Sequence, residues 1–346
     1  MSDVTIPQPT RPWQRKRREQ VRSGATFVAM AILAFAVVLF TGFAGFDGWA
    51  IVLFIISAIV LFIKGRKLSK KERKNALIQL LIASAATLAF LPWLSIFASV
   101  AMKGLAGFRI NFITSDMRTT VPDDEMNMGG ALHAIVGSFM MVIIASIITL
   151  PLGILSGVYL TEIKGRFTFL VRFVIQSMSG VPSIVAGLFV FTTYVSATHG
   201  PTAFGGALAL GILMLPTVAR TSEEVLKLVP EELRSAGYAL GARQWRTTLM
   251  VVLPTVRSGL TTVAVLGVAR VIGETAPLLL TAGSSTALRF NPVNGPIASL
   301  PIYVFGLLQI GTEYAVNRAW TGALVLMIFV FGLFITARKI GGKDKR

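Results

Sequence analysis

Two charged residues stand inside an apolar stretch in the last third of the chain. Arg270 and Glu274 are four residues apart within the run ARVIGETAPLLLTAG. In a continuous helix this spacing places both on one face. A charge in mid-membrane costs at least ~2.5–3.5 kcal/mol, so it normally faces a pore or a partner. Because a guanidinium binds oxyanions with two parallel hydrogen bonds, the pair predicts an anion pathway in which Glu274 neutralises Arg270 between transport events. A permanent salt bridge is the alternative.

Three other residues are candidates for the same pathway. Arg220 ends an apolar stretch, where the alternative is a basic side chain that snorkels to the membrane surface. Ser179 and Ser183 flank Pro182 in the sequence SGVPS. A helix broken at this proline could point a half-helix amino terminus at an anion. A simple proline kink is the interpretation that the sequence favours.

Catalytic chemistry has no support in the sequence. The chain has no cysteine and only two histidines, His133 and His199, so neither a thiolate nor a His-rich metal site can be built. No glycine-rich phosphate loop ending in Lys-Ser or Lys-Thr occurs. We therefore expect a protein that is not an enzyme and holds no cofactor, so that any ATP and magnesium on which it depends would be bound by a separate chain.

The composition requires a membrane to position these residues. Hydrophobic residues make up 54% of the chain and charged residues 14%, against about 25% charged in soluble domains. Apolar runs of roughly 18 or more residues are long enough to span a bilayer. They predict an all-α, polytopic helical bundle with eight spans, at residues 25–45, 47–63, 77–101, 131–160, 169–196, 203–220, 252–282 and 319–337.

The net charge of +17 indicates membrane topology and not nucleic-acid binding. With a cytoplasmic amino terminus, 27 of the 33 Lys and Arg residues lie on the cytoplasmic side and 5 on the other. This asymmetry places both termini in the cytoplasm. The first apolar stretch exceeds the 7–15 residues of a cleaved signal peptide, so we expect an uncleaved helix. On the outer side, the apolar residues 302–310 are too short to span and predict either an interfacial or re-entrant helix or an ordinary loop.

The loop between the sixth and seventh spans, residues 221–251, contains a helical pattern on the cytoplasmic side. Leu226, Val229, Leu233, Ala236 and Leu240 recur every three or four residues. Small residues follow and include Gly241. A short helix ended by a glycine turn could dock into a groove of a partner, or simply lie on its own protein. We call residues 221–251 the coupling loop.

Several segments of the sequence resemble a known family. Ser235-Ala236-Gly237, then Gly241, Val251 and Leu253-Pro254 match the spacing of the coupling motif of bacterial ABC importer permeases, which reads EAA, three residues, G, nine residues, I, one residue, LP. Ser235 replaces the acid and Gly237 the second alanine. The runs YLTEI, VPSIVAGLFVF, ARVIGETAPLLLTAG and PIASLP, in this order, resemble the PstA permeases of phosphate-specific ABC importers.

This resemblance implies a type I ABC importer permease fold with six core spans in residues 76–340. Residues 1–75 would then add a basic tail, two extra helices and a basic linker. The implied activity is ATP-driven import of phosphate across the bacterial cytoplasmic (inner) membrane. The implied partners are a second related permease subunit, a dimer of ATP-binding subunits and an extracytoplasmic phosphate-binding protein, besides membrane lipid. Docking of the ATPase would use Leu233, Ser235, Ala236, Gly237, Leu240 and Gly241. Transport of sulfate, molybdate or phosphonate, and a secondary carrier, are the alternatives.

Overall fold

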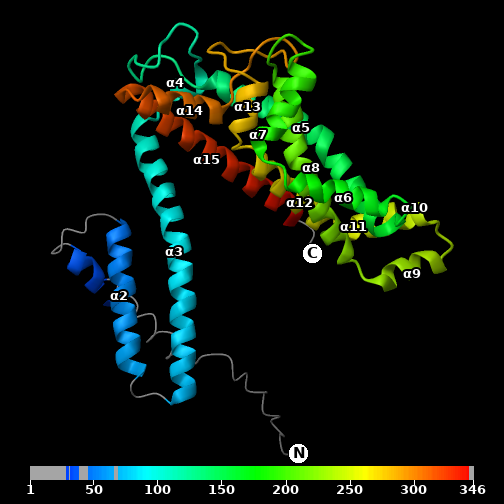
Figure 1. The fold of residues 1–346 in the computed structure, drawn as a ribbon, viewed down its shortest axis with the longest axis horizontal. Helices are drawn as coiled ribbons and strands as arrows, with labels where there is room; N and C mark the ends of the chain where they lie inside the picture. Colours follow the sequence, from blue (N-terminus) through cyan, green and yellow to red (C-terminus); the bar gives the residue numbers. More distant parts are fainter. Residues whose placement is uncertain (1–28, 31, 39–45, 66–68, 343–346) are drawn as a thin grey trace, which may run out of the picture. The chain divides into compact units, whose positions relative to one another are not determined.

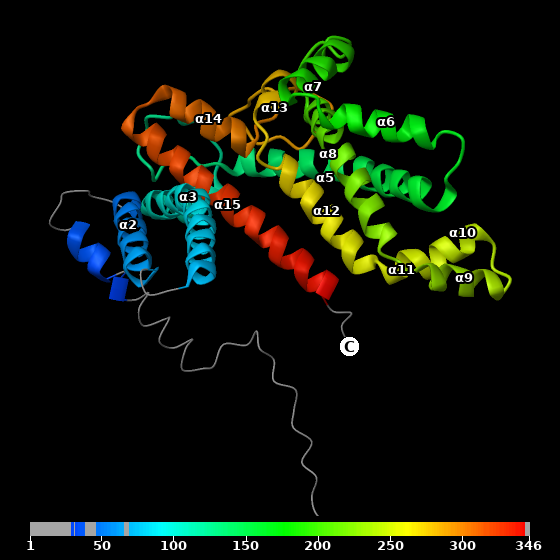
Figure 2. The same ribbon diagram turned by 60° about the horizontal axis from the view of Figure 1, so that its bottom comes forward.

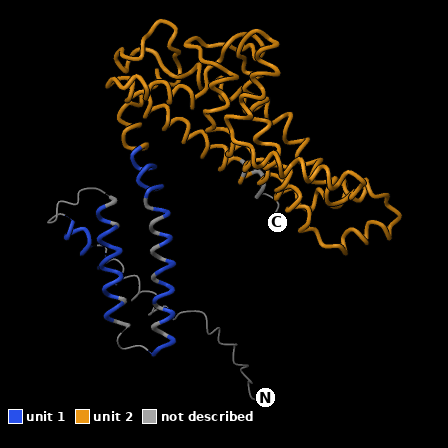
Figure 3. Tube along the Cα trace, viewed as in Figure 1, with its two compact units in different colours: residues 1–99 blue, residues 100–346 orange. Residues whose placement is uncertain are grey.

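The structure is a computed structural model that describes residues 29–30, 32–38, 46–65 and 69–342. Every regular element in these residues is helical. The chain divides into two compact units, residues 1–99 (unit 1) and residues 100–346 (unit 2), which Figure 3 colours separately. The division falls inside a long helix, so it separates two packing units, and the domain junction expected at residue 75 stays a prediction.

Unit 1 contains α2 (Phe46–Gly65) and most of α3 (Lys70–Gly107). Both helices are where apolar stretches were expected, and α3 extends well beyond the predicted span 77–101. Pro92 lies inside α3 without ending it. The first predicted span, 25–45, lies largely outside the described residues, of which residues 29–30 and 32–38 are helical.

Unit 2 contains the remaining helices (Figure 1). In chain order they are α4 (Ile110–Thr114), α5 (Leu132–Val158), the π-helical turn η1 (Tyr159–Ile163), α6 (Thr168–Ser179), α7 (Ser183–Val190), η2 (Phe191–Val195), α8 (Ala203–Lys227), α9 (Glu231–Ala239), α10 (Gln244–Thr247), η3 (Thr248–Val252), α11 (Leu253–Thr255), α12 (Arg257–Val271), α13 (Ala276–Thr281), α14 (Leu300–Ile310) and α15 (Glu313–Gly342).

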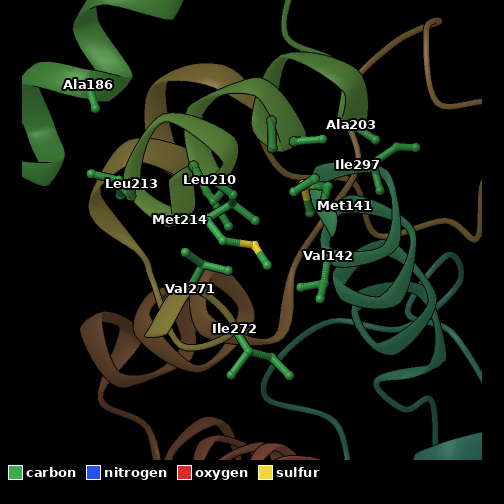
Figure 4. Close-up of a cluster of buried hydrophobic side chains, with 14 of the residues drawn as sticks. Met141, Val142, Ala186, Ala203, Leu210, Leu213, Met214, Val271, Ile272 and Ile297 are labelled. Carbon is green, nitrogen blue, oxygen red and sulfur yellow. The ribbon is translucent and has the colours of Figure 1, made fainter. Parts of the chain in front are cut away.

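The core of unit 2 forms where α5 packs along α8, and α7, α12 and α13 surround the pair. Figure 4 shows Met141 and Val142 of α5 near Leu210, Leu213 and Met214 of α8. Small residues bring the helices close together: a Cβ at Gly153 would lie 2.6 Å from a Val218 side-chain carbon, and one at Gly157 2.7 Å from the Ser222 Cβ. Such small residues are typical of helix contacts in membranes, where close van der Waals packing drives association.

Two predicted spans are not continuous helices, which corrects the expectation for 169–196 and 252–282. Helices α6 and α7 meet at an angle of 107°, and the pair Gln244–Thr255 and Arg257–Val271 at 74°. Among the described residues, three helices are long and apolar enough to cross a bilayer: Leu132–Ile163, Ala203–Lys227 and Glu313–Thr336. The count becomes five if each bent pair is one span. The total of eight stays a prediction.

The two ends of unit 2 carry different short elements. Figures 1 and 2 place α9 and α10 together at one end (the α9 end), away from α14 (the α14 end). The apolar run 302–310 is indeed helical, within α14, and packs against α15. Ser299 accepts a hydrogen bond from the backbone N–H of Ile302, and Gly311 ends the helix with a φ of 76°.

Two long connections meet at the α14 end. Fully buried Arg318 donates Nη2 hydrogen bonds to the backbone carbonyls of Asp124 and Glu125, at 3.0 and 2.8 Å. Asp116 accepts a 3.0 Å hydrogen bond from the backbone N–H of Leu288, and this bond is the main reason why the pKa of Asp116 lies below its ordinary value. Asp116 thereby joins the segments around residues 115–130 and 284–299, while Arg318 joins the first of them to α15.

Candidate functional site

Arg270 and Glu274 do not share a helix face, which corrects the expected pairing. α12 ends at Val271, and Glu274 lies in the break before α13. Pro277 explains the break, because a proline lacks the N–H that would bond to the carbonyl of Gly273 and its ring clashes with that carbonyl. Arg270 is exposed and Glu274 is half-buried, and no ion pair joins them among the residues that the structure describes.

Ser179 and Ser183 flank a complete helix break instead of a kink. Ser179 is the last residue of α6, Pro182 immediately precedes α7, and Ser183 is its first residue. The Ser179 hydroxyl donates to the Ile175 carbonyl within its own helix at 2.9 Å. The half-helices that follow the α6–α7 and α12–α13 breaks, α7 and α13, pack together. Their approach is so close that a Cβ at Gly187 of α7 would lie 2.6 Å from the Pro277 Cα of α13. The structure therefore brings two interrupted segments to one place.

Arg220 lies elsewhere, in the last third of α8, where an exposed Glu224 side chain is 3.7 Å from its Nε. Both side chains are about two-thirds exposed, and an exposed pair of this kind contributes little stability. No hydrogen bond or ion pair described within residues 69–342 links Arg220 to Arg270, Glu274, Ser179 or Ser183. The predicted pathway residues do not form one contact cluster inside this chain.

The coupling loop contains a helix, but a shorter one than its periodicity predicts. Of the periodic residues only Leu233 and Ala236 lie in α9, while Leu226 lies in the last turn of α8, Val229 lies between the two helices and Leu240 follows α9. α9 ends in a Schellman turn, in which the N–H of Gly241 bonds to the Tyr238 carbonyl and the N–H of Ala242 to the Gly237 carbonyl. Gly241 has a φ of +77°, a conformation that side chains other than glycine rarely adopt. The glycine of the motif is therefore required by the turn that ends α9.

Gly237, the second departure from the family motif, is a packing residue. It is buried, and a Cβ at this position would lie 2.8 Å from Cγ2 of Thr247 in α10. The β-branched Thr247 side chain has little rotamer freedom in a helix. Glycine at 237 and threonine at 247 thus fit each other and bring α9 against α10.

The remaining predicted coupling residues are exposed. Ser235 and Ala236 face outward on α9. Leu233 is 39% exposed and Leu240 is 90% exposed, and the neighbouring Trp245 is 54% exposed. Large apolar side chains gathered on a short polar loop indicate a contact surface for a protein partner. Every residue predicted for coupling except Gly237 is available to such a partner.

One buried ion pair at the α9 end was not predicted. Arg234 of α9 bonds both carboxylate oxygens of Glu162 in η1, with Nη2 2.9 Å from Oε1 and Nε 3.1 Å from Oε2. The Glu162 side chain is 3% exposed and the Arg234 side chain 12%. The carboxylate raises the pKa of the guanidinium above its ordinary value. Arg234 also donates to the carbonyls of Leu226 and Val229.

A cavity of about 540 Å³ lies beside this ion pair. Its lining comes from η1, α6, the end of α8 and α9, and includes Glu162 and Arg234 themselves. Across it, Arg172 of α6 and Lys227 of α8 both contact the same Glu223 oxygen at 2.7 Å. In the sequence, the only sign of this site is a single acid, Glu162, at the end of a long apolar run.

A family model and curated relatives match most of this chain. Residues 149–340 match the family model described as binding-protein-dependent transport system inner membrane component. The "Phosphate transport system permease protein PstA" of Mycobacterium leprae is 37% identical over 83% of this chain and 96% of its own length. The protein of the same name from Haemophilus influenzae is 39% identical over 71% of this chain and 86% of its own.

A solved structure supports the fold alone. A chain of the MetNI methionine ABC transporter in an inward-facing conformation gives a TM-score of 0.50 at 19% identity, covering 63% of this chain and 95% of its own. The family model covers α6 to α14, nearly all of α15, the coupling loop and the α6–α7 and α12–α13 breaks. The chain belongs to the family of binding-protein-dependent transport system inner membrane components, in the group of the PstA permease proteins.

Proposed function

We propose that this chain is the permease subunit of an ATP-driven importer that moves inorganic phosphate inward across the bacterial cytoplasmic membrane. The observation that carries the proposal is the identity of 37% to a phosphate transport system permease over almost the whole of that relative. The run ARVIGETAPLLLTAG, which resembles this group, spans the break between α12 and α13. Broken helices are a common way to present backbone groups and charges to an ion within a membrane.

The anion pathway runs along the surface of this chain and is completed by a second, related permease. Arg270 is exposed on α12, yet a guanidinium exposed to lipid is costly. A partner permease or the transported anion must therefore cover it. Glu274 and the serines beside the α6–α7 break, Ser179 and Ser183, are further candidates for the path, and Arg220 is a candidate at the end where the anion leaves.

Energy comes from a separate dimer of ATP-binding subunits that docks on the coupling loop. Leu233, Leu240 and Trp245 supply exposed apolar area for this contact. The positive-inside rule supports a cytoplasmic position for the loop and both termini. The α14 end then faces outward, where the segments joined by Asp116 and Arg318 are available to an extracytoplasmic phosphate-binding protein.

The test is reconstitution of the chain with its three kinds of partner in proteoliposomes. Phosphate, delivered by the binding protein, should stimulate both ATP hydrolysis and uptake. Sulfate, molybdate and a phosphonate, each at the same concentration, should stimulate neither. Stimulation by one of these anions in place of phosphate would assign a different oxyanion. Uptake of phosphate without ATP would indicate a secondary carrier and contradict the proposal.

A further inference from the structure

Glu162 is a connection point between a membrane helix and the coupling loop. Its carboxylate binds Arg234 of α9 through two parallel hydrogen bonds. Its backbone carbonyl accepts a 2.5 Å hydrogen bond from the side-chain amide of Gln244 in α10. One residue of η1 thus holds both short helices of the coupling loop, and the packing of Gly237 on Thr247 joins these helices to each other.

The guanidinium of Arg234 adds a second attachment. Its Nη2 donates to the carbonyl of Leu226 in the last turn of α8 at 3.1 Å, and its Nη1 to the carbonyl of Val229, just after this helix, at 2.6 Å. The fixed fork of donors in arginine allows these bonds together with the bidentate carboxylate contact. Arg234 therefore fixes α9 relative to η1 and to α8 at once.

Helix α5 connects this attachment to the α14 end of unit 2. η1 continues α5 without interruption, so Leu132–Ile163 forms one helical element of 32 residues, roughly 48 Å long at ~1.5 Å per residue. At its far end, the Ser138 hydroxyl accepts a 2.8 Å hydrogen bond from the N–H of Leu300, at the start of α14. A displacement of Glu162 would be carried along α5 to the α14 end.

Packing alone links α9 to this helix only weakly. The cavity of about 540 Å³ separates α9 from α6 and the end of α8. α9 packs mainly on α10 and η3, while Val252 of η3 packs with Val158 of α5 in a small apolar cluster. Apolar contacts of this kind can slide, whereas a buried bidentate ion pair fixes both distance and direction.

We propose that Glu162 and Arg234 are positioning residues of energy coupling, which transmit the movement of the coupling loop to α5. The inference rests on the proposed function in one respect, that the loop binds an ATPase. An ATPase that moves the loop would move η1 with it as long as the ion pair is intact. Without the pair, the Gln244 hydrogen bond and apolar contacts alone join the loop to η1, so part of the loop's movement does not reach α5 and more ATP is hydrolysed per anion imported.

The experiment measures the number of ATP molecules hydrolysed per anion imported by the full complex in proteoliposomes. The double variant Glu162→Gln with Arg234→Gln removes both charges, so that no charge is left buried without a partner. We expect this variant to assemble and to hydrolyse ATP, with at least a fivefold increase in ATP used per anion. Assembly with the ratio of the parent protein would overturn the proposal.

A conservative variant decides the case in which the double variant does not assemble. Arg234→Lys keeps the charge but loses the bidentate contact and most of the carbonyl bonds. An assembled Arg234→Lys complex with a raised ratio supports the proposal. A normal ratio, or failure of this variant to assemble as well, overturns it, because the pair would then serve folding only.

Arg172→Gln is the matched control. It removes an arginine–glutamate ion pair at the same end of unit 2, between α6 and α8, which does not touch α9. We expect its ratio to stay within twofold of that of the parent protein, and an increase as large as that of the double variant would overturn a specific role for Arg234. The ratio can be measured with whichever oxyanion the parent complex transports, so a wrong substrate would not be mistaken for a failed coupling role.

Discussion

Arg270 lies in the last turn of α12 with an exposed side chain, and the helix ends before Glu274 is reached. The two charges therefore do not neutralise each other in the structure, and each is open to another partner. Under the proposed function, the partner of Arg270 would be the anion or the second permease. Because Arg270 and Glu274 do not pair with each other, the removal of one charge does not deprive the other of a partner. The effect of a change at Arg270 can therefore be measured by itself.

We expect Arg270→Gln to lower phosphate uptake at least tenfold, while the complex assembles as in the parent protein. A tenfold loss corresponds to about 1.4 kcal/mol of transition-state free energy, a modest amount for the removal of a charged hydrogen-bond donor from an anion path. Uptake of labelled phosphate and co-purification of the partner subunits measure the two properties separately. Arg166→Gln, which removes an exposed cation outside the breaks, is the control for nonspecific effects of charge.

Two results would contradict this role of Arg270. One is full uptake by Arg270→Gln. The other is loss of assembly in Arg270→Gln that the additional change Glu274→Gln restores together with uptake. The second result would show that the two residues form a salt bridge in the assembled complex and that Arg270 serves packing.

At the scale of elements, the contact between α9 and α10 depends on the absence of a side chain at Gly237. The motif of the family has alanine at this position, and alanine favours a helix by about 0.8–1.0 kcal/mol over glycine. Here the methyl group would overlap Thr247 Cγ2. Overpacking of this kind typically costs ~1–3 kcal/mol, so the overlap outweighs the helix propensity.

Gly237→Ala should therefore destabilise the coupling loop, by roughly 1 kcal/mol. The double variant Gly237→Ala with Thr247→Ala should be at least as stable as the parent, because the new Cβ would then face only the Cβ of residue 247, at 3.5 Å. The rate of proteolytic cleavage within residues 225–250 of the purified complex measures local stability. Equal cleavage rates for the parent and Gly237→Ala would show that α9 and α10 are not packed as described.

The sequence predicts which stretches are helical better than it predicts their directions. Hydropathy identified α5, α8 and α15, because a long apolar run has few other ways to satisfy its backbone in lipid. It merged α6 with α7, since apolar composition says nothing about the angle between successive helices. Pro182 and Pro277 marked the α6–α7 and α12–α13 breaks, but a proline inside a membrane helix is compatible with a mild kink, and Pro92 of α3 shows that it can leave a helix continuous.

Among the functional residues too, the sequence predicts local features but not contacts between distant segments. The spacing within the coupling loop predicts a helix and a glycine turn, because both are local properties of consecutive residues. The ion pair of Glu162 and Arg234 joins residues that are 72 positions apart, and no periodicity within one segment indicates such a contact. It depends on how η1 and α9 meet in the folded chain.

At the scale of the whole molecule, the part of the chain that the family model matches lies within unit 2. The family model matches residues 149–340, and unit 2 comprises residues 100–346. The Mycobacterium leprae relative is covered over 96% of its length by only 83% of this chain. This chain therefore carries residues that the relative does not require, and the tail with the first two helices is where we expect them.

Deletion of residues 1–63 tests whether these helices are peripheral to transport. The basic linker from Lys64 to Lys74, which includes the first turn of α3, would remain and would form the new amino terminus. Its seven Lys and Arg residues should still hold this end in the cytoplasm, so the orientation of the later spans should not change. We expect the shortened chain to assemble with its partners and to keep at least a third of the uptake per complex. Normal expression and assembly with complete loss of uptake would show that the first two helices belong to the transport machinery. Protease accessibility of the carboxyl terminus, measured in inside-out vesicles, separates this outcome from an inverted topology.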